Sequence, residues 1–337
     1  MKVSRRGLIA AGGRTLATFA ATAVVATTLA AIAMPAAAQT WPDKPITFVN
    51  PFAAGGGTDA FARPLAAELS KQLGQSVIID NRGGAGGTLG AGIAARAPKD
   101  GYTFFVGAVH HSIAPAIYPK LTYDIEKDFE PISVVAVVPH VVVVNPTRVQ
   151  AKSLKELIDA AKANPGKMSY GSAGNGTSHH LAGELFKILT KTDIQHIPYK
   201  GAGPALQDLI GGQIDMMFDG LGSSAAHIKG GKIAALSVAS KSRSDSLPNV
   251  PTAAEAGVPG FEISAWYGVW AIAGTPKDIT ARMATEIEKA LKSDAVKSVW
   301  ASQGAKVGVS GPEMATFLKS EIGNWAKVAK DANIKID

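Results

Sequence analysis

The feature that most constrains the fold is one pattern that recurs along the chain from Trp41 onward. A short run of β-branched and other apolar residues is followed by a glycine-rich or polar turn and then by an amphipathic helical stretch. The first copy has a strand at 46–50, a loop at 51–57 and a helical stretch whose large apolar residues recur every four positions. This alternation predicts parallel strands with helices packed on both sides, which is an α/β fold.

The units of strand, turn and helix fall into two consecutive groups along the chain, which predicts two lobes. After the second series, a long apolar strand at 261–272 is followed only by helical stretches. Because this C-terminal segment has too few strands to be a separate α/β domain, we expect it to complete the first lobe. The predicted organisation is a first lobe of 39–140 and 262–337 and a second lobe of 141–261. Each lobe is expected to hold a mainly parallel sheet flanked by helices, and two crossover strands are expected to join them.

Three local features carry separate expectations. Pro64 falls inside the first helical stretch, so it should kink that helix or open its main part. The polar residues at 110–112 follow a predicted strand and are expected to form a loop. Pro204 is expected to open a helix of the second lobe as its first residue.

The N-terminus has the pattern of an export signal. An uncharged stretch at 16–34 precedes three alanines that end at Ala38, and four basic residues open the chain: Lys2, Arg5, Arg6 and Arg14. Residues 1–38 are therefore predicted to be a signal peptide that is cleaved near Ala38, which places the protein in the periplasm. An uncleaved membrane anchor is the alternative, because the uncharged stretch approaches the ~20 residues that span a bilayer. Arg5-Arg6 loosely resembles a twin-arginine signal, so the export route stays open.

Charge and cysteine content exclude several classes of function. The chain has 34 basic and 27 acidic residues, a net charge of +7, but four of the basic residues lie in the predicted signal. Removing them leaves 30 basic against 27 acidic residues, about +3, so nucleic acid is not an expected partner. The absence of cysteine from the sequence excludes disulfides, thiol nucleophiles and cysteine-ligated metals.

Three glycine-rich loops, at 51–59, 81–88 and 171–177, follow predicted strands. Open α/β sheets bind ligands at the carboxyl ends of their strands. Glycine lets the backbone approach a ligand closely, and the helix that follows offers unpaired N–H groups at the positive end of its dipole. Two of the loops belong to one lobe and one to the other, so we predict a site for a small acidic molecule between the lobes.

Rival readings of these residues are weaker. Gly55 and Gly57 followed by Asp80 resemble a dinucleotide-binding pattern, which leaves an exported NAD-dependent dehydrogenase as the alternative function. A serine hydrolase is disfavoured because Tyr170 stands where the nucleophile elbow needs glycine. His180 and Glu184 are four residues apart but have no third ligand in view, so they are interpreted as a packing pair. No cofactor and no metal are predicted.

Several sequence segments resemble one known family. They are PFAAGGGTDAFAR at 51–63, VIIDNRGGAGGTLG at 77–90, DGYTFFVG at 100–107, YGSAGNGTSHHLAGELF at 170–186, HIPYKGAGPALQDLIGGQIDMMFDG at 196–220 and LPNVPTAAEAGVPGFE at 247–262. In this order they are similar to the Bug-type solute receptors of tripartite tricarboxylate transporters, over about 41–335. The resemblance implies a monomeric, two-lobed periplasmic-binding-protein fold of the Venus flytrap type. It also implies capture of a small organic acid, delivery to membrane permease subunits, and no catalysis.

The resemblance also implies a set of ligand-binding residues, carried over by position. They are Phe52, Ala53, Ala54, Gly56, Thr58, Asp59, Asn81, Gly84, Ala85, His110, Ser172, Asn175, Gly176, Thr177, Tyr199, Lys200 and Asp219. His110 departs from the family pattern, where a smaller or hydroxyl residue is expected. A bulky imidazole beside Phe52 favours an aromatic or short acid over an extended dicarboxylate. A scaffold or adhesion protein, the remaining alternative, would bind no small molecule.

Overall fold

The computed structural model describes residues 41–331. The predicted export signal, residues 1–38, lies outside the described residues. Within residues 41–331, none of the helices combines the length and the apolar character that crossing a bilayer requires.

Strands and helices alternate along most of the described chain, as the repeated pattern predicts. The strands are β1 (Ile46–Asn50), β2 (Val77–Asn81), β3 (Thr103–Ala108), β4 (Phe129–Val144), β5 (Ser169–Ser172), β6 (Gln195–Pro198), β7 (Met216–Gly220), β8 (Ala234–Val238) and β9 (Ser264–Ile272). The helices are α2 (Gly57–Leu73), α3 (Thr88–Ala95), α4 (His110–Ile117), α5 (Leu154–Ala163), α6 (Ser178–Thr190), α7 (Ala202–Ile210), α8 (Leu221–Lys229), α9 (Lys277–Lys292), α10 (Asp294–Ser302) and α11 (Pro312–Asp331), with a 3-10 turn, η1 (Ala85–Gly87).

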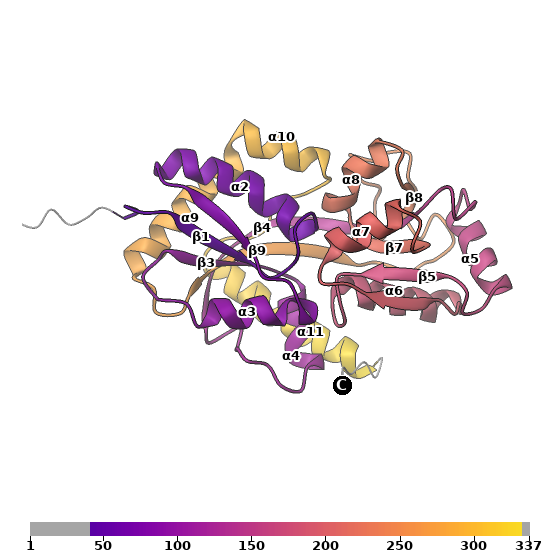
Figure 1. The fold of residues 1–337 in the computed structure, drawn as a ribbon, viewed down its shortest axis with the longest axis horizontal. Helices are drawn as coiled ribbons and strands as arrows, with labels where there is room; N and C mark the ends of the chain where they lie inside the picture. The colour runs from indigo at the N-terminus through magenta and orange to yellow at the C-terminus, as the bar shows by residue number, and fades with distance from the viewer. Residues whose placement is uncertain (1–40, 332–337) are drawn as a thin grey trace, which may run out of the picture. The chain divides into compact units, whose positions relative to one another are not determined.

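These strands form one sheet with two parallel halves. The order is β2-β1-β3-β9-β4-β7-β5-β6, and β8 pairs with β4. β1 is parallel to β2 and β3, and β5 is parallel to β6 and β7, whereas every pair that includes β4 or β9 is antiparallel. β4 pairs with β9 as far as Pro139 and with β7 from His140 onward, so it runs from one half into the other (Figure 1).

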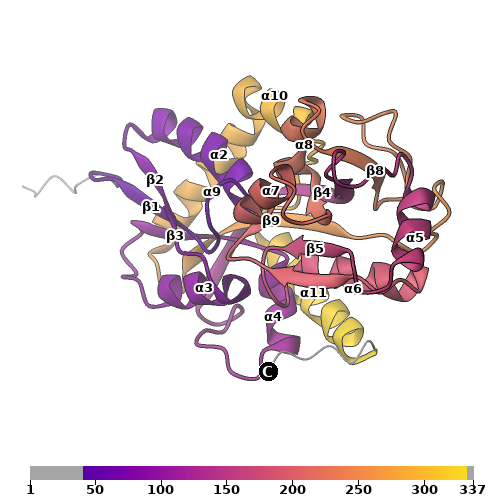
Figure 2. The same ribbon diagram turned by 45° about the vertical axis from the view of Figure 1, so that its right-hand side comes forward.

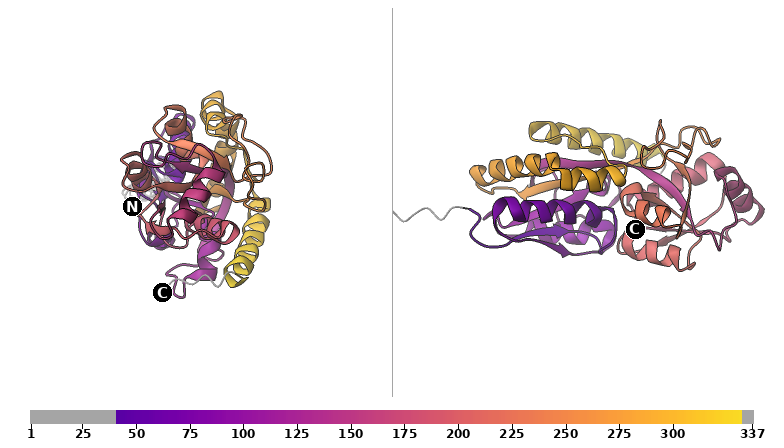
Figure 3. Two further views of the ribbon diagram at one scale, coloured as in Figure 1. Left: turned by 90° about the vertical axis from the view of Figure 1, so that its right-hand side faces the viewer. Right: turned by 90° about the horizontal axis from the view of Figure 1, so that it is seen from above.

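The two halves of the sheet correspond to two lobes, which confirms the predicted fold. We call β1, β2 and β3 with α2, α3 and α4 the first lobe, and β5 to β8 with α5 to α8 the second lobe. The C-terminal helices α9 and α10 pack against α2, and α11 packs against α4 (Figures 1 and 3). The residue boundaries of the lobes stay a prediction.

Both faces of the second half-sheet are covered by helices, which accounts for the run of four valines at the end of β4. Val142 and Val144 belong to a buried cluster with residues of α5 and α6. Val141 and Val143 belong to a second cluster with residues of α7 and α8. Successive strand residues point to opposite faces, so a strand buried on both faces needs an uninterrupted apolar run. Figure 2 shows α7 and α8 on one side of β5 and α6 on the other.

Three local predictions are corrected by the structure. Residues 110–112 do not form a loop, because α4 begins at His110 and all three side chains are buried. Polar atoms of two of them bond to nearby backbone: Ser112 Oγ donates to the Val109 carbonyl, and His111 Nδ1 accepts from the Ala108 amide at 3.1 Å. α2 continues as one helix through Pro64, so Pro64 does not open its main part, while the kink stays a prediction. α7 begins two residues before Pro204, in a first turn where a missing N–H costs little.

Candidate functional site

The candidate site lies where loops of the two lobes meet. The loops after β1, β2 and β3 come from the carboxyl ends of one parallel set, and the loops after β5, β6 and β7 come from the carboxyl ends of the other. The Ala53 amide donates to the Lys200 carbonyl across the two lobes at 3.1 Å. The carboxyl ends of both half-sheets therefore face a common region.

The loop after β1 is held in place by a polar network beneath it. Asn81 Nδ2 donates to the Phe52 carbonyl at 2.9 Å, and the Gly55 amide donates to Asp59 Oδ2 at 3.0 Å. Arg63 Nε donates to the same Asp59 oxygen at 2.7 Å, and this hydrogen bond raises the pKa of Arg63. Asp59 and Asn81, both predicted to contact a ligand, thus shape the loop.

α2 begins directly after this loop without a capping side chain. Its N-cap is Gly56, so no side chain can accept from the N–H groups of the first turn. Gly57 is required there, because a Cβ at this position would lie 2.0 Å from Tyr267 Oη. The start of α7 in the second lobe is built in the same way, with Gly201 as its N-cap.

The glycine-rich loop after β5 uses its hydroxyl groups internally. Ser172 Oγ accepts from the Gly174 amide at 3.0 Å and lies 2.6 Å from His196 Nε2. Burial, together with the nearby His180, lowers the pKa of His196 to about 3, so its ring is neutral. Thr177 Oγ1 donates to the Gly174 carbonyl at 2.7 Å and accepts from the His180 amide, which caps α6. These hydroxyls shape the loop, and their direct contact with a ligand stays a prediction.

A small cavity lies between the lobes at the starts of these helices. Its volume is about 10 Å³, which leaves room for about one water. We call it the inner cavity; it is lined by Phe52, Gly56, Gly57, Thr58, His110, Ala173, His179, Ala202 and Tyr267. It therefore joins the loop after β1, the loop after β5, and the uncapped N-termini of α2 and α7.

Two histidines bring polar atoms to the inner cavity from opposite lobes. His110 Nδ1 accepts a hydrogen bond from the Ser178 amide at 2.9 Å. Burial, with the nearby His179, His111 and His140, lowers the pKa of His110 well below its usual range, so the ring is neutral. His179 Nε2 lies 3.0 Å from Asp219 Oδ1.

Asp219 is fully buried and completes this polar group. Burial alone would raise its pKa, but hydrogen bonds from His179, Ser224 and Ser223 outweigh that effect and lower it. The carboxylate is thus ionised and directed at the second-lobe groups that surround it. Asp219 was predicted to contact a ligand; the structure makes it the partner of a cavity residue.

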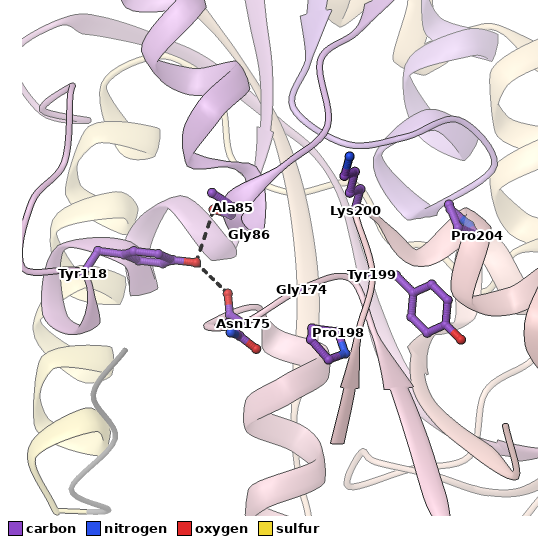
Figure 4. A pocket seen from close by; sticks show the side chains of 9 residues that line it. All are labelled: Ala85, Gly86, Tyr118, Gly174, Asn175, Pro198, Tyr199, Lys200 and Pro204. Atoms are coloured by element: carbon purple, nitrogen blue, oxygen red, sulfur yellow. Dashed lines mark hydrogen bonds between the residues drawn. The ribbon is translucent and has the colours of Figure 1, made fainter. Parts of the chain in front are cut away.

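A larger cavity opens between the lobes on the outside of these contacts, with a volume of about 630 Å³. We call it the outer cavity; it is lined by Ala85, Gly86, Tyr118, Gly174, Asn175, Pro198, Tyr199, Lys200 and Pro204. Figure 4 shows Tyr118 reaching across it, where its hydroxyl donates to the Asn175 carbonyl at 2.7 Å and contacts the Ala85 carbonyl at 3.2 Å. Tyr199 Oη donates to Asp208 at 2.7 Å.

The predicted residues therefore divide among several places. The inner cavity includes Phe52, Gly56, Thr58 and His110, and the outer cavity includes Ala85, Asn175, Tyr199 and Lys200. Ala53 contributes an amide to the contact between lobes, and Ala54 lies against Gly203. Neither cavity is lined by the remaining predicted residues, which are Asp59, Asn81, Gly84, Ser172, Gly176, Thr177 and Asp219.

Three cavity residues with polar side chains were missed by sequence reasoning. Tyr267 lies inside a long apolar strand, where nothing in the pattern marks the face that meets the other lobe. Tyr118 follows α4, which was not predicted. His179 had a usable signal, because it occupies the first turn of a helix that follows a glycine-rich loop.

The rival motifs have other roles in the structure. Asp80, expected to bind a ribose in the dehydrogenase reading, accepts from Arg82 Nε at 2.9 Å. His180 stacks on His196, and Glu184 accepts from the Tyr170 hydroxyl at 2.8 Å, so these residues do form a packing group. Among residues 41–331, no three His, Asp or Glu side chains are grouped so that they could hold a metal ion.

Comparison with known proteins agrees with this geometry. The sequence model described as the tripartite tricarboxylate transporter family receptor matches residues 61–334. The periplasmic binding protein BugD is 36% identical, with a TM-score of 0.84 over 88% of this chain and 99% of BugD. An R. palustris protein solved with adipate is 39% identical, with a TM-score of 0.83 over 88% and 99% of the two chains. MatC of Rhodopseudomonas palustris, solved with bound malate, is 36% identical, with a TM-score of 0.79 over 86% and 99%.

Proposed function

The chain belongs to the tripartite tricarboxylate transporter receptor family, and from this premise we propose that it is a periplasmic receptor for a small organic carboxylate. It captures the carboxylate between its lobes and delivers it to a membrane permease. The observation that carries this proposal is the inner cavity, where the uncapped N-termini of α2 and α7 meet from opposite lobes.

The electrostatics of the inner cavity suit an anion. The N-terminus of a helix offers free N–H groups and stabilises a negative charge by about 0.3 to 2 kcal/mol. Among the described residues that line the inner cavity, none carries a permanent positive charge. A carboxylate would therefore be bound by backbone dipoles and neutral hydrogen-bond donors, without the desolvation cost of a buried cation.

Closure of the lobes is the second part of the proposal. The inner cavity has room for only about one water in this structure, so an organic acid enters a form in which the lobes stand apart. In that form the contacts from Ala53 to Lys200 and from Tyr118 to Asn175 are broken. The form that closes around the acid is then wider at the inner cavity than this structure. A ligand that bonds both lobes shifts the population toward the closed form, whereas one that touches a single lobe leaves it unchanged.

The ligand class and the cellular setting follow from the family. Relatives of 36–39% identity have been solved with adipate and with malate, which supports a carboxylate as the ligand here. We place the receptor in the periplasm after removal of residues 1–38, with lobes of 39–140 plus 262–337 and of 141–261. The permease is the partner that would recognise the closed form of the receptor.

Calorimetry of the purified protein with adipate, succinate, malate, benzoate and acetate tests the proposal, with small-angle scattering of each mixture. We expect at least one acid to bind without turnover and to reduce the radius of gyration. Binding with no change in that radius would contradict the closure step. No binding of any acid would contradict the function and favour the scaffold alternative.

A further inference from the structure

One atom in the inner cavity does not match a simple carboxylate. His179 is the second residue of α6 and only 3% exposed, and it lines the inner cavity. Its Nδ1 is buried and has no hydrogen-bond partner among the described residues. Buried polar atoms are nearly always paired, so this nitrogen calls for a partner that the protein itself does not supply.

The bonding of the other ring nitrogen decides what Nδ1 can do. Nε2 lies 3.0 Å from an oxygen of Asp219, and Ser223 and Ser224 donate to the second oxygen of that carboxylate. A carboxylate only accepts, so Nε2 carries the ring proton. With this as its single proton, the ring presents a lone pair at Nδ1, which then acts as a hydrogen-bond acceptor.

The surrounding groups have the opposite character. The first turns of α2 and α7 present backbone N–H donors. His110 accepts from the Ser178 amide through Nδ1, so its own ring proton is on Nε2, which is another donor. A carboxylate satisfies these donors but would meet the lone pair of His179 Nδ1 with lone pairs of its own.

We propose that His179 is a specificity-determining residue that selects a hydroxyl-bearing carboxylate, whose hydroxyl donates to His179 Nδ1. This inference rests on the proposed function. An ammonium group would also donate, but it would lie against the positive ends of α2 and α7, which disfavour a cation. A hydroxy acid satisfies both the donors of the inner cavity and the acceptor at His179 Nδ1.

Matched pairs of acids that differ only in the hydroxyl test this inference. The pairs are L-malate with succinate, L-lactate with propionate, and 4-hydroxybenzoate with benzoate, each measured by calorimetry at pH 8. For at least one pair we expect the hydroxy acid to bind about tenfold or more tightly, because a deoxy acid leaves a buried acceptor unpaired. Equal affinities within every pair that binds would overturn the inference.

The variant His179→Gln tests the role of the Nδ1 atom separately from that of Nε2. The Gln amide can still donate to Asp219, as Nε2 does. Its own acceptor, the amide oxygen, then lies on the side of the chain away from the Nδ1 position. We expect the preference for the hydroxy acid to fall to within about threefold while the deoxy acid binds nearly as before. The matched control is His227→Gln in the last turn of α8, which lines neither cavity and should keep the preference. A preference that survives in His179→Gln would overturn the inference.

Two outcomes distinguish a failure of the proposed function from a failure of this inference. If no acid binds, the proposed function fails and this inference fails with it; if acids bind without a hydroxyl preference, only this inference fails. Should His179→Gln not fold, ¹⁵N NMR of the imidazole in the unmodified protein decides. We expect a proton on Nε2 and a bare Nδ1 whose resonance shifts when the hydroxy acid binds. A proton on Nδ1 would overturn the inference.

Discussion

His110 Nδ1 accepts a hydrogen bond of 2.9 Å from the Ser178 amide, so a side chain of the first lobe pairs with the first turn of a second-lobe helix. The bond exists only while the lobes are in contact. His110 thus lines the inner cavity and also holds the two lobes together.

Removing this link should favour the open form. His110→Phe keeps an aromatic ring beside Phe52 but leaves the Ser178 amide without an acceptor. A net hydrogen bond of about 1 kcal/mol predicts a roughly fivefold weaker affinity for the cognate acid. Small-angle scattering should show a larger radius of gyration without ligand, and calorimetry should show the loss. An unchanged radius and affinity would mean that the bond does not stabilise closure.

The buried histidines predict a stability that falls in acid. Burial lowers the pKa of His111 to about 4 and the pKa of His140 to about 3. Because both are lower than the ~6.5 of an unfolded histidine, the unfolded chain binds more protons, and the stabilisation is complete above pH 6.5. It should decline as the pH falls from about 6.5 toward 3, by several kcal/mol in total. Urea unfolding at a series of pH values measures this; a midpoint that stays constant from pH 7 to 4.5 would contradict it.

Asn81 should affect binding more than folding. Asn81→Ala removes the donor to the Phe52 carbonyl and a partner of Arg63, so the loop after β1 loses its main anchor. We expect affinity for the cognate acid to fall about tenfold, while the free energy of unfolding falls by about 1 kcal/mol. Calorimetry and urea unfolding measure the two quantities. Asn164→Ala, at the exposed end of α5, is the control and should leave the affinity unchanged.

Gly57 tests the close packing at the start of α2. In Gly57→Ala the methyl group would lie 2.0 Å from Tyr267 Oη and 2.7 Å from its Cζ, so the helix start or the ring must move. We expect a loss of about 2 kcal/mol of stability and at least tenfold weaker binding. Gly323→Ala in α11 meets nothing within 4 Å and should be neutral or stabilising by up to ~1 kcal/mol. Normal binding by Gly57→Ala would show that the start of α2 is not part of the site.

The sequence predicted the elements well where local signals were strong. α6 shows such a signal, because Thr177 caps it and an amphipathic stretch follows a glycine-rich loop. Residues 110–112 were predicted wrongly because three polar residues suggest solvent. In the structure all three are buried, with hydrogen bonds to nearby backbone and, for His110, from the Ser178 amide of the other lobe. α8 was not predicted, since its small residues give little periodicity.

The site was predicted more coarsely than the fold. The glycine-rich loops indicated where the lobes meet, because a glycine-rich loop before a helix can be recognised from a few neighbouring residues. Residue roles were harder to assign: the Ser172 and Thr177 hydroxyls bond to nearby backbone, as short hydroxyl side chains in turns often do. Tyr267 could not be found, since the face of a strand that meets another lobe depends on how the two half-sheets are arranged.

A crystal structure of the protein with its cognate carboxylate would show directly where the acid binds. We expect carboxylate oxygens within hydrogen-bond distance of backbone N–H groups in the first turns of both α2 and α7, with the lobes closed. A carboxylate bound to one lobe alone, or held only between Tyr118 and Lys200 in the outer cavity, would contradict this expectation.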